Sequence, residues 1–261
     1  MEKSPGPHTL LVTISAIGHK PSVFFFPGMG MPVSSFGELS ANLGDGHPLY
    51  ALNEADFIDL TGRIKTIEQI AGQYAEAIRA SKYIAPPILA GYSFGGHMAL
   101  ETARLLAAAG EAEPLVILID TYPAPPYRTM SLIKRMQFYF AGLRKLSSFK
   151  KLAGYFTWKK FSRNYSSSLH AIQKRLGRRG VSPYSAAYKS FNRYQPVPYP
   201  GRVVLFKASQ REWDEEYFIM DAWEKIITGR VDVRTVPGKH LDLMNNPTAI
   251  DLAKQMKEVM G

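Results

Sequence analysis

Short runs of apolar residues alternate along the chain with longer stretches in which apolar residues recur every three or four positions. The short runs predict strands, at residues 9–14, 22–26, 48–52, 88–92, 115–119, 202–208 and 231–236. The longer stretches predict helices, at about 34–43, 66–82, 96–108, 219–227 and 247–259. We expect Thr66 to cap the second helix and Pro247 to lie in the first turn of the last one. This alternation predicts an α/β fold with a mostly parallel central sheet flanked by helices on both faces.

Residues 121–195 interrupt this rhythm, because they contain no strand pattern. Their apolar residues fall on one face of amphipathic helical turns, as with Leu132, Met136, Phe140 and Leu143. We therefore predict an α/β core formed by residues 1–120 and 196–261, and a helical insertion formed by residues 121–195.

The same segment carries much of the positive charge. It holds 16 Lys and Arg and no Asp or Glu, whereas the rest of the chain holds the other 16 basic residues and all 22 acidic ones. The net charge is +10. A simple solvated surface, a docking site for an acidic partner, and a contact with an anionic ligand or membrane surface are all consistent with this charge. No aromatic-basic binding module accompanies it, so we expect no nucleic-acid partner.

Composition narrows the class of protein further. The chain has 261 residues of which 46% are hydrophobic, enough for the core of one α/β domain. It has no cysteine, which excludes disulfides, zinc–thiolate sites and a cysteine nucleophile. Residues 1–7 are polar and precede no signal-peptide pattern, and no run of about 18 apolar residues could span a membrane. We expect a cytoplasmic protein that does not enter a membrane.

A G-x-S-x-G pentapeptide at residues 91–95 lies between an expected strand and an expected helix. In this setting the serine occupies a strained turn that exposes its hydroxyl beside the amino end of the helix. The flanking glycines remove side chains that would clash there. We therefore expect Ser93 to be a nucleophile rather than part of an ordinary Gly-Ser turn.

A serine hydroxyl needs a base, and six histidines are available. His240 follows the last expected strand and a Pro-Gly turn, where the hydrolase order of serine, acid and histidine places the base. His97 lies one helical turn after Ser93, a position better suited to packing or gating. We expect His240 to be the base.

Two aspartates could orient the imidazole. Asp120 closes the strand that follows the serine helix, and Asp214 comes after the later strand at 202–208. Many hydrolases carry their acid at the later position, so both remain open, although Asp120 fits well. Asp242 is too close to His240 in sequence to be this acid, and we expect it to cap the next turn.

The oxyanion formed during attack requires two N–H donors. One should be the N–H of Phe94, the residue after the nucleophile. The other should come from the loop after the strand at 22–26, and we expect the Met29 N–H. The alternative for this loop is an ordinary strand-to-helix turn.

Four segments together resemble a known family: residues 26–30 (FPGMG), 91–96 (GYSFGG), 118–123 (LIDTYP) and 238–240 (GKH). Their order and spacing are similar to those of the thioesterase domains of non-ribosomal peptide synthetases, polyketide synthases and animal fatty-acid synthase. The resemblance implies an α/β-hydrolase fold, favours Asp120 over Asp214, and implies that residues 121–195 form a helical lid.

The resemblance also implies a substrate and a partner. The substrate would be an acyl, polyketide or peptidyl chain held as a thioester on the phosphopantetheine arm of an acyl or peptidyl carrier protein. Release would occur by hydrolysis or cyclisation, with no tightly bound cofactor and no metal. An acidic carrier could dock near the basic lid.

Two other functions are compatible with the residues. The first is a free-standing lipase or esterase whose basic lid docks on anionic lipid. The second is a non-catalytic α/β-hydrolase-like binding protein that uses its basic segment to hold a partner; the presence of Ser93, Asp120 and His240 argues against it.

Overall fold

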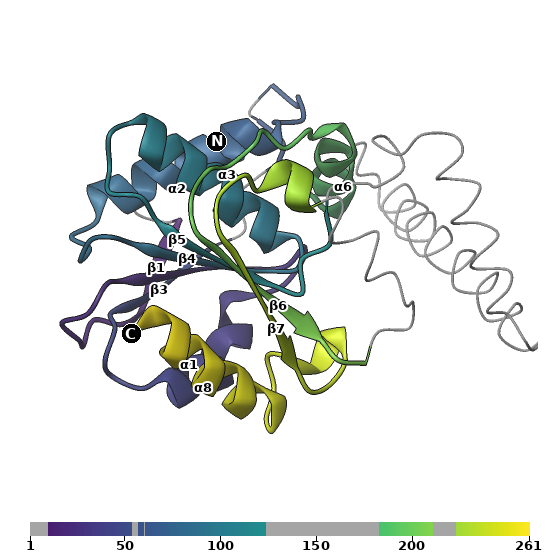
Figure 1. The fold of residues 1–261 in the computed structure, drawn as a ribbon. Helices are drawn as coiled ribbons and strands as arrows, with labels where there is room; N and C mark the ends of the chain where they lie inside the picture. Colours follow the sequence, from purple (N-terminus) through teal and green to yellow (C-terminus); the bar gives the residue numbers. More distant parts are fainter. Residues whose placement is uncertain (1–9, 54–56, 60, 124–182, 211–222) are drawn as a thin grey trace, which may run out of the picture.

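The computed structural model describes residues 10–53, 57–59, 61–123, 183–210 and 223–261 (Figure 1). Its strands are β1 Leu11–Ser15, β2 Val23–Phe26, β3 Leu49–Leu52, β4 Ile88–Tyr92, β5 Leu115–Ile119, β6 Val203–Ala208 and β7 Val231–Val236. Its α-helices are α1 Gly37–Leu43, α2 Ile67–Ala80, α3 Gly95–Ala108, α6 Pro183–Arg193 and α8 Thr248–Met260. The structure also has two short 3-10 helices, η2 Val33–Phe36 and η3 His240–Asp242.

The strands form one seven-stranded sheet in the order β1-β3-β2-β4-β5-β6-β7. Strand β1 pairs antiparallel with β3, and every other neighbouring pair is parallel. The prediction of a mostly parallel sheet is therefore confirmed. Strand β4 lies in the middle, and the chain order reverses between it and β2. In such sheets ligands bind beyond the carboxyl ends of the strands at this reversal point.

Helices cover both faces of the sheet, as the sequence predicted. Helices α2 and α3 pack on one face, and α1 and α8 pack on the other (Figure 1). Two buried clusters of hydrophobic side chains lie between these layers, one on each side of the sheet. Burial on both faces explains why the central strands are continuous apolar runs in the sequence.

Local sequence signals explain the helix ends. The side chain of Thr66 accepts a hydrogen bond from the Gln69 N–H at 3.3 Å, and the Gln69 side chain accepts one from the Thr66 N–H. This capping box satisfies two N–H groups at the start of α2. The helix expected at 34–43 is divided in the structure, because its first turn is the 3-10 helix η2.

The expected helical insertion at 121–195 lies mostly outside the described residues. Its described carboxyl-terminal part contains the helix α6. The expected helix at 219–227 is described only from residue 223, and residues 223–226 are helical.

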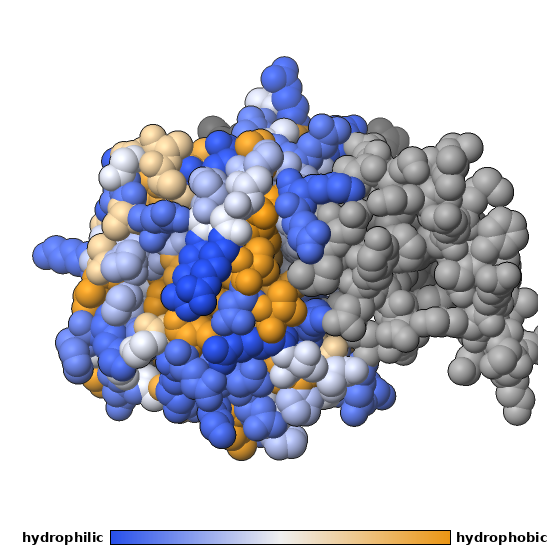
Figure 2. All heavy atoms as spheres, in the orientation of Figure 1, coloured by the Kyte–Doolittle hydropathy of each residue, from blue (hydrophilic) through white to orange (hydrophobic). Residues whose placement is uncertain are grey.

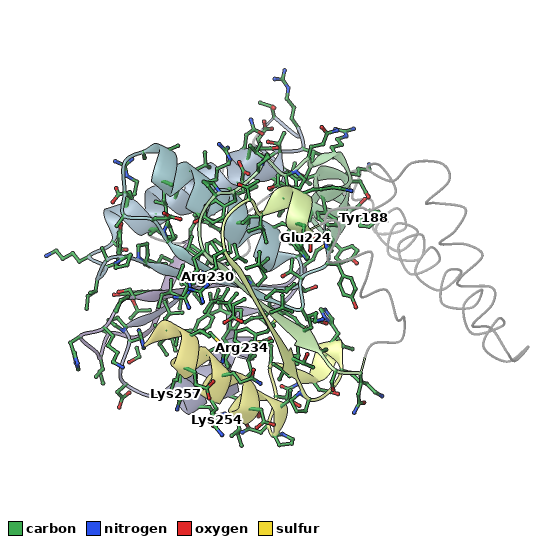
Figure 3. All side chains as sticks on the ribbon, in the orientation of Figure 1. Tyr188, Glu224, Arg230, Arg234, Lys254 and Lys257 are labelled. Atoms are coloured by element: carbon green, nitrogen blue, oxygen red, sulfur yellow. The ribbon has the colours of Figure 1, made fainter. Side chains whose placement is uncertain are left out.

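Strand β7 forms one edge of the sheet. Figure 2 shows apolar surface along the middle of the face where β6 and β7 run, and Val233 is 37% exposed. Arg234, labelled in Figure 3, places its guanidinium 2.7 Å from the Glu258 carboxylate on α8 and 3.3 Å from Asp232. Charged side chains of this kind discourage pairing of an edge strand with another chain.

Among the described helices, none combines the length and the apolar character that crossing a bilayer requires.

Candidate active site

Ser93 lies on the sharp turn that joins β4 to α3. Its φ of 53° is left-handed, a conformation that costs a non-glycine residue about 1–3 kcal/mol. Strand and helix approach so closely here that a Cβ atom on Gly91 would collide with the carbonyl oxygen of Gly95. Glycine at position 91 is therefore a steric requirement. The turn leaves the Ser93 hydroxyl at the amino end of α3, where the helix dipole is positive.

His240 reaches the same edge of the sheet from the other end of the chain. It follows β7 and Gly238, whose φ of 110° turns the backbone toward the site. The imidazole Nε2 lies 3.1 Å from the Ser93 Oγ, so the two groups are within hydrogen-bond distance. The His240 side chain keeps 32% of its surface exposed, and Ser93 is half-buried.

Asp120 lies at the end of β5 and is fully buried. One carboxylate oxygen, Oδ2, is 2.7 Å from the His240 Nδ1, and the other, Oδ1, accepts a hydrogen bond from the Ala208 N–H at 3.0 Å. A carboxylate accepts hydrogen bonds only, so Nδ1 carries the proton and Nε2 presents its lone pair to Ser93. The structure thus brings together Ser93, His240 and Asp120. The rival Asp214 lies outside the described residues.

Two buried rings hold the segment that follows Asp120. Asp120 has a φ of 46°, so its backbone is also left-handed. The Trp223 Nε1–H donates to the Thr121 carbonyl at 3.3 Å, and the His97 Nε2 lies 2.7 Å from the Tyr122 carbonyl oxygen. Because a carbonyl can only accept, His97 donates from Nε2. These two bonds fix the backbone just beyond the acid.

His97 packs in an aromatic environment rather than facing the serine. The centroid of its ring lies 4.9 Å from the ring centroid of Phe191, 5.9 Å from that of Tyr194 and 5.8 Å from that of Trp223. Burial lowers the pKa of His97 from 6.5 to about 4, so the ring is neutral at physiological pH. Its Nδ1 has no hydrogen-bond partner among the described residues.

The loop after β2 lies directly against the serine turn. A Cβ atom on Gly95 would collide with the carbonyl oxygen of Phe26, and the carbonyl of Pro27 is almost as close. Within the described part of the chain, neither the Met29 N–H nor the Phe94 N–H donates a hydrogen bond to another protein group. Both N–H groups are therefore without a protein acceptor in this part of the chain.

The Phe94 side chain is held by aromatic contacts from two other segments. Its ring lies 5.9 Å from that of Phe57 and 5.5 Å, edge to face, from that of Phe191 on α6. The described end of the expected insertion therefore packs against the serine turn itself.

Sequence reasoning assigned no role to Trp223 and did not anticipate the contact of Tyr92 with His240. The hydrogen bond from Trp223 to Thr121 joins positions 102 residues apart and has no sequence signal. The spacing of His97 from Ser93 correctly indicated a packing position. In the described ranges, no cluster of three or more His, Asp or Glu side chains could hold a metal ion.

Comparison with protein families and curated proteins gives consistent matches. The family model described as "Thioesterase domain" matches residues 21–253. Malpinin synthetase of Mortierella alpina is 28% identical over 253 residues, covering 95% of this chain and 3% of that protein. A dimodular nonribosomal peptide synthase of Bacillus subtilis (strain 168) is 23% identical over 242 residues, covering 90% of this chain and 10% of that protein. The chain thus spans a small fraction of the length of these relatives.

Solved structures share the fold. The NocB thioesterase domain, solved as a covalent complex with a fluorophosphonate nocardicin G analogue, is 21% identical with a TM-score of 0.62. The match covers 96% of this chain and 99% of that domain. The chain therefore has the fold of this thioesterase domain, in agreement with the α/β-hydrolase fold expected from the sequence.

Proposed function

Because this chain belongs to the thioesterase domain family, as its motifs predicted, we propose that it releases acyl, polyketide or peptidyl chains from carrier-protein thioesters. In this proposal Ser93 is the nucleophile, His240 the general base and Asp120 the residue that orients His240. Each substrate would be held on the phosphopantetheine arm of an acyl or peptidyl carrier protein. That arm belongs to the carrier, so the proposal includes no resident cofactor and no metal.

The observation that carries the proposal is the continuous path from Ser93 Oγ to His240 Nε2 at 3.1 Å and from His240 Nδ1 to Asp120 Oδ2 at 2.7 Å. The Ser93 oxygen attacks the thioester carbonyl carbon while its proton moves to Nε2. The buried carboxylate of Asp120 stabilises the imidazolium that forms. Collapse of the tetrahedral intermediate breaks the carbon–sulfur bond, and Nε2 returns the proton to the departing thiolate.

The second half of the reaction removes the acyl group from Ser93. Water, or an amine or hydroxyl of the chain itself, gives its proton to His240 Nε2 and attacks the ester carbonyl. Collapse of this second intermediate returns the proton to Ser93 Oγ and frees an acid or a ring. The N–H groups of Met29 and Phe94 would hold the oxyanion in both halves. The contact of Gly95 with the loop after β2 supports this pairing, because it keeps the two segments together.

We also propose that residues 121–195 act as a lid on a core formed by residues 1–120 and 196–261. The packing of Phe191 on Phe94 supports a location over the serine turn. The 16 basic residues of this segment would raise the rate of encounter with an acidic carrier protein. The rate of acyl transfer from such a carrier should then fall with increasing salt, while turnover of a small uncharged thioester should not.

Replacing Ser93 with Ala tests the central assignment. We expect Ser93→Ala to retain the carrier-bound thioester, and the native chain to release it and to be labelled at Ser93 by a fluorophosphonate. Release by Ser93→Ala at the native rate would refute the proposal. Activity that increases with anionic vesicles and ignores carrier-bound thioesters would indicate a lipase or esterase. Failure of Ser93 to react with the probe would indicate a binding protein.

The mode of release requires a separate measurement. Mass spectrometry of the released product distinguishes a linear acid, which has gained one water, from a ring. The acyl group found on the carrier in the Ser93→Ala variant identifies the chain that the enzyme receives.

A further inference from the structure

Tyr92 is the last residue of β4 and precedes Ser93 directly in the chain. Its ring stacks on the imidazole of His240, with the ring centroids 4.9 Å apart and the planes 19° from parallel. Its hydroxyl donates a hydrogen bond to the backbone carbonyl of His240 at 2.7 Å. One side chain therefore contacts both the ring and the backbone of the histidine, although 148 residues separate the two positions.

His240 depends on such contacts because its own segment is short. It begins the three-residue helix η3, two residues after Gly238, whose φ is positive. The two ring nitrogens are engaged by Ser93 and Asp120 in the plane of the imidazole. Those hydrogen bonds do not prevent the ring from tilting out of that plane. A stacked ring against one face of the imidazole does.

Tyr92 is itself firmly held. It is 6% exposed, and its Cδ1 lies 3.2 Å from the position a Cβ atom would occupy on Gly28, in the loop after β2. Burial, together with the negative charges of Asp120 and Asp242, raises the pKa of the Tyr92 hydroxyl, so it remains a donor throughout the working pH range. Tyr122, the second aromatic neighbour of His240 among the described residues, is tilted by 60° with its centroid 6.3 Å away and does not stack.

We propose that Tyr92 is a positioning residue for His240, in which the hydroxyl fixes the histidine backbone and the stacked ring favours the imidazolium formed during proton transfer. The electron-rich face of an aromatic ring attracts a cation stacked on it. Because Tyr92 and Ser93 are consecutive, the same strand end positions the nucleophile and supports its base. The inference rests on the proposed function, since it assumes that His240 takes the Ser93 proton.

Two substitutions separate the two contributions. Tyr92→Phe keeps the stacked ring and removes the hydroxyl. Tyr92→Leu removes both. The readouts are kcat and KM for an acyl thioester of N-acetylcysteamine, the pH profile of kcat/KM, and the melting temperature.

We expect Tyr92→Phe to lower kcat roughly two- to tenfold, because one hydrogen bond is lost, while the pH profile of kcat/KM keeps its native shape and position. We expect Tyr92→Leu to lower kcat further and to move the acidic limb of the pH profile of kcat/KM to lower pH, because the imidazolium loses its aromatic neighbour. KM should change little in both variants, since neither contact touches the substrate.

Tyr199→Phe is the matched control. Tyr199 is also buried, and its hydroxyl also donates to a backbone carbonyl, that of Pro114 at 3.1 Å, away from the serine turn. We expect this control to lower the melting temperature while leaving kcat and the pH profile as in the native chain. A purely structural role for Tyr92 would give the same result at position 92.

The inference is overturned if Tyr92→Phe and Tyr92→Leu keep the native pH profile and a kcat within about twofold of the native value. The Ser93→Ala variant distinguishes this failure from failure of the proposed function. If Ser93→Ala is inactive while both Tyr92 variants behave like the native chain, only the role of Tyr92 is wrong. If Ser93→Ala still releases product, the serine mechanism itself is wrong.

Discussion

Ser93 and Asp120 both adopt left-handed backbone conformations, with φ angles of 53° and 46°, at the carboxyl ends of the adjacent parallel strands β4 and β5. Among the described residues, no other non-glycine residue has a positive φ. The Ser93 N–H donates to the carbonyl of Ile119, the residue before Asp120, at 2.9 Å. The two strained residues are therefore held side by side, and each turns its side chain toward His240.

The strain at Ser93 should be measurable as a difference between two inactive variants. We expect Ser93→Gly to be more stable to urea than Ser93→Ala by about 1 kcal/mol, because glycine adopts a left-handed φ without a Cβ clash. Ser40, in the middle of α1, is the control position, where the order should reverse because alanine favours a helix. Equal stability of Ser93→Gly and Ser93→Ala would contradict a strained turn.

Asp120→Asn should remove the acid while keeping its shape. The amide would offer an N–H to His240 Nδ1, and the tautomer it favours has no lone pair on Nε2 to accept the Ser93 proton. We expect kcat for thioester hydrolysis to fall on the order of 10³- to 10⁴-fold. Asp214→Asn is the comparison variant and should keep near-native kcat. The opposite result, with Asp214 essential and Asp120 dispensable, would assign the acid to the later position.

His97 should make stability depend on pH. Its pKa is about 4 in the folded chain, compared with 6.5 for an ordinary histidine, so the unfolded chain binds the proton first. Above pH 6.5, His97 is neutral in both states and does not reduce the free energy of unfolding. As the pH falls toward 4, this free energy decreases by a total of about 3 kcal/mol, because only the unfolded chain binds the proton.

The measurement is the difference in unfolding free energy between the native chain and His97→Gln at several pH values. Glutamine keeps an N–H for the Tyr122 carbonyl but does not titrate. The unfolding free energy of the native chain minus that of the variant should decrease from pH 6.5 to 4. The carboxylates titrate alike in both chains, so their contributions cancel in this difference. A difference independent of pH would show that His97 is not held neutral by burial.

Gly95 should tolerate no side chain. A Cβ atom there would collide with the Phe26 carbonyl, so Gly95→Ala must push the loop after β2 away from the serine turn. We expect loss of fluorophosphonate labelling and a lower melting temperature. Gly72→Ala is the control: no atom lies within 4 Å of the new Cβ on α2, and it should stabilise by up to about 1 kcal/mol. Native labelling by Gly95→Ala would argue against the Met29 and Phe94 oxyanion site.

Most strands were predicted from the sequence to within one residue at each end. The runs at 88–92 and 115–119 match β4 and β5 residue for residue, because strands covered on both faces are uninterrupted apolar segments. The run at 9–14 was displaced from the observed β1, Leu11–Ser15, an edge strand whose register shifts between Thr13 and Ser15. Burial alone does not account for this displacement, because the edge strand β7 is mostly partly exposed and was predicted residue for residue.

The sequence indicated the reacting residues of the candidate site but not the contacts that support them. The G-x-S-x-G motif and the order of serine, acid and histidine indicated Ser93, Asp120 and His240 as candidates. Residue reasoning alone left Asp120 and Asp214 open, because both follow predicted strands. The supports of the site had no sequence signal: the Trp223 bond to Thr121 and the Tyr92 stack on His240 join distant positions.

By itself, the sequence determined which chemical groups are available and in what order they occur, because motifs and apolar periodicity are local properties of the chain. The tertiary structure alone decided that Ser93 and His240, 147 positions apart, meet at 3.1 Å, and that Asp120 lies behind them. The physical reason is the parallel sheet. Its strands all end at one edge, and the spacing and register of neighbouring strands set which side chains come within hydrogen-bond distance.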